Sequence, residues 1–167
     1  LDLYTLWFSR SLAMRVAVPL PRALPMFVLA GLFLGMQPPP TWTSAGAWMV
    51  ATLGALMLSC AISTLILISL LWTVSGDGIS VLLYAAVVLL SGMVVPLPLF
   101  PDWAQPVLNF LPFRGLGDVP FRLYIGHISP GEILPLFTHQ MAWTVALVVL
   151  GRGILRMGMR RLVVQGG

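Results

Sequence analysis

The chain has 167 residues, of which 59% are hydrophobic and only 8% are charged, whereas about a quarter of the residues of a soluble domain are charged. This composition excludes an ordinary soluble domain and indicates an integral membrane protein. The net charge of +4 comes from nine arginines and no lysine, and these arginines lie at the ends of apolar stretches, as topological anchors do, rather than on a nucleic-acid-binding surface.

Three long stretches of the chain contain no Asp, Glu, Lys or Arg. The first runs from Ala23 to Gly76, the second lies between Asp77 and Asp102, and the third lies between Glu132 and Arg152. A helix needs roughly 20 predominantly apolar residues to cross a bilayer, and each stretch is long enough for that. The sequence therefore predicts an all-α, polytopic membrane protein with about four transmembrane helices.

The predicted elements begin with an interfacial helix near the N-terminus, which carries Trp7, Arg10 and Arg15. The first transmembrane helix is broken near its start by Pro19, Pro21 and Pro25 and ends at "QPPPT", because successive prolines stop a helix. The second ends at the polar turn "SGDGIS". The predicted spans are 18–36, 44–74, 79–95 and 132–152, and together with the segment 96–131 they form one permease-like domain over residues 1–167.

The distribution of arginine predicts the orientation of the chain. The segment up to Arg22 contains three arginines and the tail from Arg152 contains four. The positive-inside rule therefore places both termini in the cytoplasm, which requires an even number of crossings. Four spans satisfy this requirement and place "QPPPT" and residues 96–131 outside.

The segment 96–131 is apolar enough to enter a membrane but too rich in proline to form a continuous helix. A crossing there would break the even number of spans, and lipid-exposed backbone must satisfy its polar groups internally. We therefore expect an external, re-entrant segment that turns back, with aromatic side chains at the depth of the interface. The candidate residues of this segment are Pro96, Pro98, Pro101, Trp103, Pro112 and Phe113.

An ordered set of short motifs resembles the last part of a permease subunit of the type-2 ABC exporter class, in its uncharacterised bacterial branch with six spans. The motifs are "SG" at Ser91-Gly92, "PL" at Pro96-Leu97, "FP" at Phe100-Pro101, "LPF" at 111–113, Pro120, "YIG" at 124–126, Gln140, Trp143 and the terminal "QGG". The resemblance covers the whole chain and is strongest from Ser91 onward. It corresponds to the last four of six spans, so we expect that the chain, which starts at Leu1 rather than Met, lacks its natural N-terminus.

The resemblance implies a bacterial plasma-membrane protein that is not itself an enzyme and holds no cofactor. Its implied partners are a cytosolic ATP-binding cassette subunit, on which ATP is hydrolysed, a second permease subunit and membrane lipids, with no nucleic acid. No G-x-x-x-x-G-K-[ST] loop for nucleotide phosphates occurs in the sequence. The candidates for coupling to the cassette are Trp7, Arg10, Arg15 and Asp77.

Several candidate residues have two interpretations. His139 and Gln140 form the strongly polar pair inside a predicted span, and His139 is either an interfacial anchor or a substrate or proton site. Asp77 either contacts a partner or simply belongs to a polar turn. Small residues recur every four positions from Ala47 to Ser63, which indicates either packing within the subunit or a dimer seam.

Two other classes remain as alternatives. A secondary transporter or channel subunit would place charged coupling groups near the midplane of the membrane, and the predicted spans carry charge only at their ends. A membrane-embedded enzyme would require a nucleophile with a base, or paired carboxylates, at a protected depth. The single Cys60 has no metal-ligand spacing around it, so we expect it to be a packing residue.

Overall fold

A computed structural model describes residues 2–70 and 76–159, and within these ranges the regular structure is entirely helical. The all-α prediction is thus confirmed. The long helices are α1 (Leu3–Ala17), α2 (Pro19–Phe33), α3 (Trp42–Ser69), α4 (Gly76–Leu90) and α7 (Ile133–Met159). Five short helices fill the segment before α7: η2 (Leu97–Leu99), α5 (Gln105–Phe110), η3 (Pro112–Gly115), α6 (Asp118–Tyr124) and η4 (Pro130–Glu132).

Three of the described helical stretches are long and apolar enough to cross a membrane. They are Leu3–Phe33, Trp42–Ser69 and Pro130–Met159. The apolar part of α4, Ser80–Leu90, is shorter, and the 15 residues of α4 span about 22 Å, against about 30 Å for the hydrocarbon core. That α4 crosses as a fourth span stays a prediction.

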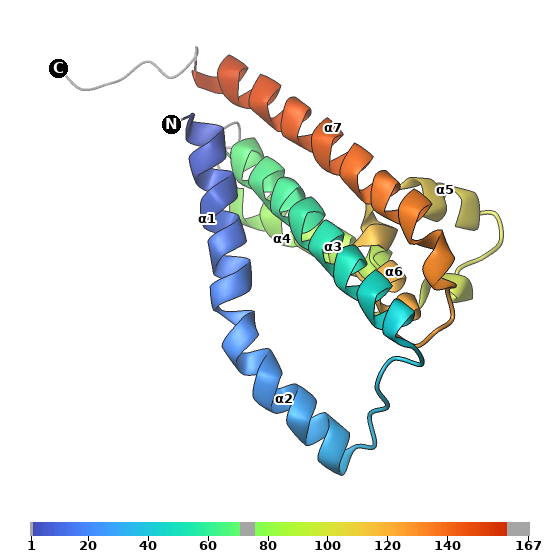
Figure 1. The fold of residues 1–167 in the computed structure, drawn as a ribbon. Helices are drawn as coiled ribbons and strands as arrows, with labels where there is room; N and C mark the ends of the chain where they lie inside the picture. Colours follow the sequence, from blue (N-terminus) through green and yellow to red (C-terminus); the bar gives the residue numbers. More distant parts are fainter. Residues whose placement is uncertain (1, 71–75, 160–167) are drawn as a thin grey trace.

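The first span differs from the sequence prediction because α1 and α2 form one bent helix rather than an interfacial helix followed by a separate span (Figure 1). Only Val18 separates the two, and its backbone N–H still donates to the Met14 carbonyl at 3.3 Å. Pro19 and Pro21 lack the N–H groups that would continue the helical ladder. The prolines therefore bend the helix without ending it.

The N-terminal helix α1 packs along the bundle. Its Tyr4 is only 2% exposed and forms a hydrophobic cluster with Ile68 of α3 and Leu155 of α7. The start of α1 and the end of α7 therefore lie at the same end of the molecule (Figure 1). These contacts join α1 to α3 and α7, and its position at the membrane interface stays a prediction.

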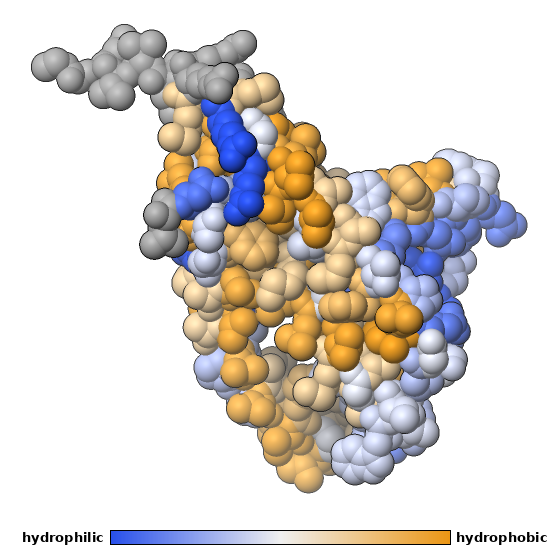
Figure 2. Space-filling view, turned by 45° about the horizontal axis from the view of Figure 1, so that its top comes forward, coloured by the Kyte–Doolittle hydropathy of each residue, from blue (hydrophilic) through white to orange (hydrophobic). Residues whose placement is uncertain are grey.

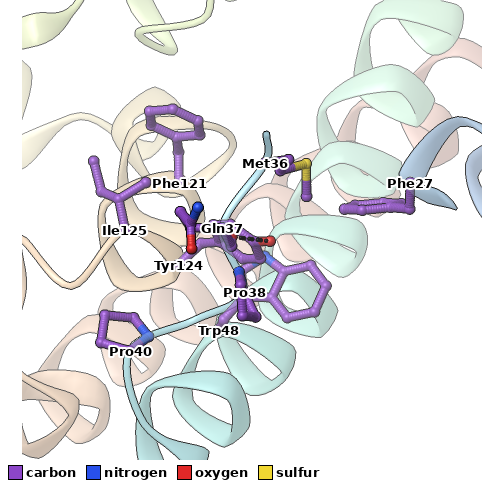
Figure 3. Close-up of a pocket in the computed structure, with 9 residues that line it drawn as sticks. All are labelled: Phe27, Met36, Gln37, Pro38, Pro40, Trp48, Phe121, Tyr124 and Ile125. Atoms are coloured by element: carbon purple, nitrogen blue, oxygen red, sulfur yellow. Dashed lines mark hydrogen bonds between the residues drawn. The ribbon is translucent and has the colours of Figure 1, made fainter. Parts of the chain in front are cut away.

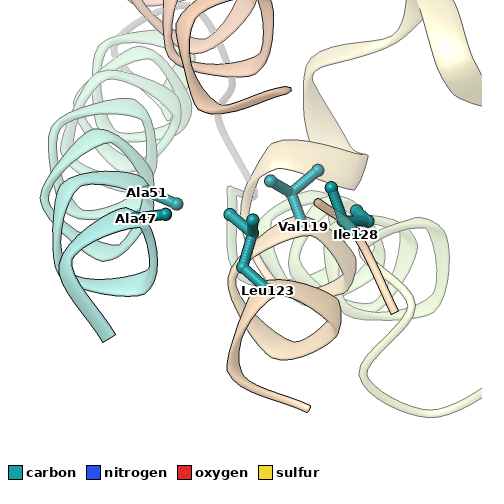
Figure 4. Packing of buried hydrophobic residues seen from close by; sticks show 5 residues of the cluster. All are labelled: Ala47, Ala51, Val119, Leu123 and Ile128. Atoms are coloured by element: carbon teal, nitrogen blue, oxygen red, sulfur yellow. The ribbon is translucent and has the colours of Figure 1, made fainter. Parts of the chain in front are cut away.

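The core of the fold is the pair α3 and α7, which run in the same direction with the short helix α6 packed against the beginning of α3 (Figure 1). Ala47 and Ala51, 6% and 0% exposed, present small side chains to Val119 and Leu123 of α6 (Figure 4). Small residues allow helices to approach closely. At these two positions, the predicted small-residue stripe serves packing within the chain.

The α4 helix ends at Leu90, earlier than the predicted span that reaches position 95. Gly92 follows with φ +83°, and a Cβ there would lie 3.1 Å from the Cβ of Asp118. Both the left-handed backbone and the close approach favour glycine. The Ser91 carbonyl accepts from the Asp118 N–H at 3.0 Å, so the turn after α4 is held directly against α6.

The segment 96–131 enters the bundle and returns. Phe113 and Leu116 pack with Leu58 and Ile62 in the middle of α3. Further along, Tyr124 reaches the beginning of α3, where its ring lies 5.4 Å from that of Trp48. Relative to the helix pair, the segment thus forms a hairpin whose inner corner is η3.

The surface is apolar between two polar ends. Hydrophilic residues gather near the end that holds the start of α1, and again over the region of α5, with hydrophobic residues between them (Figure 2). Many large apolar side chains on this belt are more than half exposed, among them Leu24, Met26 and Leu32 of α2 and Leu82 of α4. An exposed apolar belt of this kind suits a protein surrounded by lipid.

Candidate functional site

Gln140 joins the hairpin corner to both core helices. The residue is 1% exposed, and its Nε2 donates to the carbonyl of Ala51 at 3.0 Å and to that of Gly115 at 2.8 Å. Its Oε1 is buried without a hydrogen-bond partner in the described structure. This oxygen fits only because position 54 is glycine, since a Cβ there would lie 2.2 Å from it. The joint therefore fixes η3 between α3 and α7.

The neighbouring His139 holds α5 against α7. The carbonyl oxygen of Phe110, at the end of α5, accepts from Trp143 Nε1 at 2.9 Å and lies 2.9 Å from His139 Nε2. The rings of Phe110 and Trp143 pack edge to face, with centroids 5.5 Å apart. His139 thus contacts the end of α5, and both of its interpretations, an interfacial anchor and a site for substrate or proton movement, stay predictions.

A charged cluster forms the entry to α6. Asp118, 7% exposed, lies in the first turn, and its Oδ2 is 3.5 Å from Arg114 Nε and 3.7 Å from Arg122 Nη1. Arg114 also donates from Nη1 to Asn109 Oδ1 at 2.8 Å. Because one carboxylate is shared by two guanidinium groups, this cluster carries a net positive charge.

Three cavities adjoin one another along one side of α3. The largest, 780 Å³, lies between α3, α6 and the turn after α4, and it contains the predicted Pro96 and Pro98 in its wall. A second cavity of 330 Å³ lies between α1, α3 and α4 and shares Thr52 and Leu116 with the first. Together they form a continuous, mostly apolar depression.

The third cavity, 530 Å³, opens where α2 meets the beginning of α3 (Figure 3). Phe27 of α2 approaches Trp48 with ring centroids 6.5 Å apart. The Tyr124 hydroxyl donates to the Gln37 carbonyl at 2.9 Å, which ties α6 to the proline-rich connection. This cavity shares Trp48 and Phe121 with the largest one.

The other predicted residues of the proline-rich segment have different environments. The Pro101 carbonyl accepts from the Ala104 N–H at 2.9 Å and so shapes the turn before α5. Trp103 is 80% exposed, while Pro112 is buried at the hairpin corner and Phe113 packs against α3. The structure thus divides the segment into an exposed outer part and a buried inner corner.

The predicted coupling residues with described side chains, Trp7, Arg10 and Arg15, have different environments. Trp7 is partly buried against the cluster of Tyr4 and Ile68, and Arg15 donates to the Ser63 hydroxyl of α3. Arg10 is exposed. Asp77 lies at the start of α4, but its side chain falls outside the described residues.

An interaction between the two ends of the chain was not predicted. Arg152 of α7 lies over the Tyr4 ring at 5.5 Å, its Nε is 3.6 Å from Asp2 Oδ2, and its Nη2 donates to Thr5 at 3.3 Å. Nothing in the local sequence around Arg152 specifies these partners, because they lie at the opposite end of the chain. No group of three or more His, Cys, Asp or Glu residues within the described ranges could hold a metal ion.

Long apolar helices, polar ends and a hairpin folded back into the bundle define the chain as a polytopic α-helical membrane protein. The sequence model of the family described as "ABC-2 family transporter protein" matches residues 20–166, so the chain belongs to this family. The resemblance to type-2 ABC permeases is confirmed, and with it the role of a transporter membrane component. None of the curated proteins or solved structures to which the chain was compared matches it significantly.

Proposed function

We propose that this chain is the membrane-spanning permease subunit of an ABC exporter and that it uses ATP hydrolysed by a separate cassette subunit. The observation that carries the proposal is the family match over residues 20–166, on a chain with three helices long and apolar enough to cross a membrane. Membrane components of this kind supply the pathway, whereas the nucleotide chemistry belongs to the partner.

The proposed topology places the start of α1 and the end of α7 in the cytoplasm of a bacterium, with α4 as a short fourth crossing. The arginines near both termini support this orientation. The hairpin 96–131 then lies on the outer side as a re-entrant segment. Its support is the return of the chain from Phe113, at the middle of α3, to Tyr124, near the beginning of α3.

The cassette subunit is proposed to contact the end of the bundle where α1 begins. Arg10 is the best candidate for this contact, because it is exposed while Trp7 and Arg15 contact other helices of the same chain. The functional unit would pair two permease subunits with two cassettes, surrounded by lipid. Movement of the cassettes on ATP binding would then reach the core through α1 and its contacts with Ile68 and Leu155.

The test is co-expression of the full chain with an ATP-binding cassette subunit from the same genome, followed by purification through a tag on the permease. The expected result is a stable complex with ATPase activity. Arg10→Glu should weaken the association roughly tenfold, as the loss of a charged contact does at an interface. Asp102→Arg, which also reverses one exposed charge but lies before α5, should leave the association unchanged.

Transport by the reconstituted chain without a cassette, driven by an ion gradient, would contradict the proposal and favour a secondary transporter. Equal loss of association from Arg10→Glu and Asp102→Arg would refute the assignment of the coupling end.

A further inference from the structure

We propose that the 780 Å³ cavity beside α6 binds the acidic headgroup of a single-chain, anionic amphiphile, with Arg122 and His127 at the headgroup end and the apolar wall around the tail. This inference rests on the proposed function and names the substrate class of the permease. The volume falls within the range of about 300–1,000 Å³ that is usual for small-molecule sites.

The cavity wall is mostly apolar. Of the side chains that line it, only Thr52, Asp118, Arg122 and His127 are polar, and the remainder include Trp48, Leu116 and Phe121. A saccharide or another highly hydroxylated ligand would lose its hydrogen bonds to water here without replacement, which costs free energy for every unpaired group. The wall therefore favours a ligand that is largely hydrocarbon.

The charge in the cavity selects the sign of the headgroup. The side chain of Asp118 is only 6% exposed and is shared with Arg114, whereas the side chain of Arg122 is 33% exposed. The 3.7 Å between Arg122 Nη1 and Asp118 Oδ2 is longer than a hydrogen bond. The guanidinium of Arg122 thus keeps its donors for a ligand. Arg114, which lies outside the cavity wall, partly neutralises Asp118 from behind, so Arg122 is the charge that faces a ligand.

The opposite end of the depression provides room for a tail. The adjoining 330 Å³ cavity continues from Thr52 and Leu116 past Leu56 and Val87. Its wall also contains Arg15, which donates to the Ser63 hydroxyl in the same wall. An extended hydrocarbon chain that starts at Arg122 would follow this wall along α3. A cationic amphiphile would be repelled by Arg122, and a neutral one would gain nothing from it, so an anionic headgroup is the chemistry that the cavity recognises best.

The experiment measures quenching of tryptophan fluorescence in the full chain in detergent. The probes are a saturated fatty carboxylate brominated beside its carboxyl group, the same carboxylate brominated at its far end, and the corresponding brominated fatty alcohols. Trp48 lines both this cavity and the adjoining 530 Å³ cavity, so the difference in quenching between the wild-type chain and Trp48→Phe isolates the signal from these two sites. Arg122 lines the larger one and not the 530 Å³ cavity, so its substitution assigns the signal between them. We expect saturable quenching of Trp48 by the carboxylate, strongest when the bromine is beside the carboxyl group.

Arg122→Gln should weaken binding of the carboxylate roughly tenfold, as the loss of one charge-assisted contact predicts, and should leave binding of the alcohol unchanged. Arg122→Lys retains the charge and should retain most of the affinity. Arg156→Gln removes an exposed arginine on α7 that lines none of these cavities and serves as the matched control. If Arg122→Gln fails to fold, His127→Gln, in an exposed loop, tests the same end of the cavity.

Equal affinity of the wild-type chain for the carboxylate and the alcohol would overturn the proposal, as would equal effects of Arg122→Gln and Arg156→Gln. Absence of any quenching of Trp48 would overturn it too and would indicate that the cavity is covered, for example by a second copy of the chain. In each of these outcomes the cassette still co-purifies if the proposed permease function is right, so the two failures are distinguishable.

Discussion

The substitution Gly54→Ala tests whether the Gln140 joint stabilises the fold. A Cβ at position 54 would lie 2.2 Å from Gln140 Oε1, 2.8 Å from its Cδ and 3.2 Å from Cδ2 of Phe137. Contacts this close require a neighbour to move. Gln140 is held by two hydrogen bonds, to Ala51 and Gly115, so it cannot rotate away without losing them.

The size of the effect follows from two routes. If Gln140 moves, two hydrogen bonds are lost at about 1 kcal/mol each, and if it stays, overpacking costs about 1–3 kcal/mol. Against either loss, replacing glycine by alanine inside a helix raises the free energy of unfolding by about 1 kcal/mol through helix propensity. We therefore expect the free energy of unfolding to fall by about 1 kcal/mol if Gln140 moves, and by up to about 2 kcal/mol if it stays.

The matched control lies on the same helix. A Cβ at Gly46 meets nothing within 4 Å, so Gly46→Ala should raise the free energy of unfolding by up to about 1 kcal/mol through helix propensity alone. The two alanine variants should differ by about 1–3 kcal/mol, which separates their Tm values by roughly 2–12 °C for a chain of this size. Thermal unfolding of the purified chain in detergent, followed by circular dichroism, measures this difference.

The double variant Gly54→Ala/Gln140→Ala sharpens the test. Removing the glutamine side chain makes room for the new methyl group, so the combined loss should be smaller than the sum of the two single losses by about 1 kcal/mol. Equal Tm values for Gly54→Ala and Gly46→Ala, or strict additivity in the double variant, would refute the interlocking of these residues.

Two further predictions concern the hairpin. In a Cys60→Ala background, Asp102→Cys should react with an impermeant thiol reagent added from outside and Leu108→Cys should not, because Asp102 is exposed and Leu108 is 5% exposed. Reaction of Asp102→Cys only from the cytoplasm would contradict the proposed position of the hairpin on the outer side of the membrane. Asp118→Asn should lower the free energy of unfolding by about 1–3 kcal/mol, since it leaves two arginines beside a largely buried neutral group. The control Asp2→Asn, which breaks an exposed ion pair, should change it by less than about 0.5 kcal/mol. Calorimetry of both variants measures the difference, and equal losses would argue against a stabilising role of the Asp118 cluster.

The sequence predicted the long helices better than their junctions. The apolar run that ends in "QPPPT" fixed the beginning of α3, where Thr41 caps the helix by accepting from the Ser44 N–H at 3.1 Å. The scattered prolines after Val18 indicated a break, but the contacts of Tyr4 with α3 and α7 keep α1 in the bundle. Tertiary packing of this kind is invisible to a local pattern, which is why the sequence predicted two elements where the structure has one bent helical stretch, Leu3–Phe33.

The candidate site was predictable in its polar residues but not in their partners. Gln140 stood out because a strongly polar side chain inside an apolar span needs a reason. Its partners, Ala51 and Gly115, contribute backbone carbonyls, which carry no residue-specific signal in a sequence. The role of Gly54 could not be predicted either, because a sequence does not show why a helix contains glycine. The structure shows the reason, since a Cβ at this position would meet Gln140 Oε1.

The arrangement of fixed and loosely held helices indicates where movement during transport should occur. Gln140 fastens the hairpin corner to α3 and α7, and α6 is packed on α3 through Val119 and Leu123. By contrast, α2 has no buried residue, and most of the described side chains of α4 are exposed. Regions with few buried apolar contacts open at the lowest cost. Since α4 and α2 border the cavities along α3, displacement of these two helices would change the volume of the cavities while the core and the hairpin stay fixed.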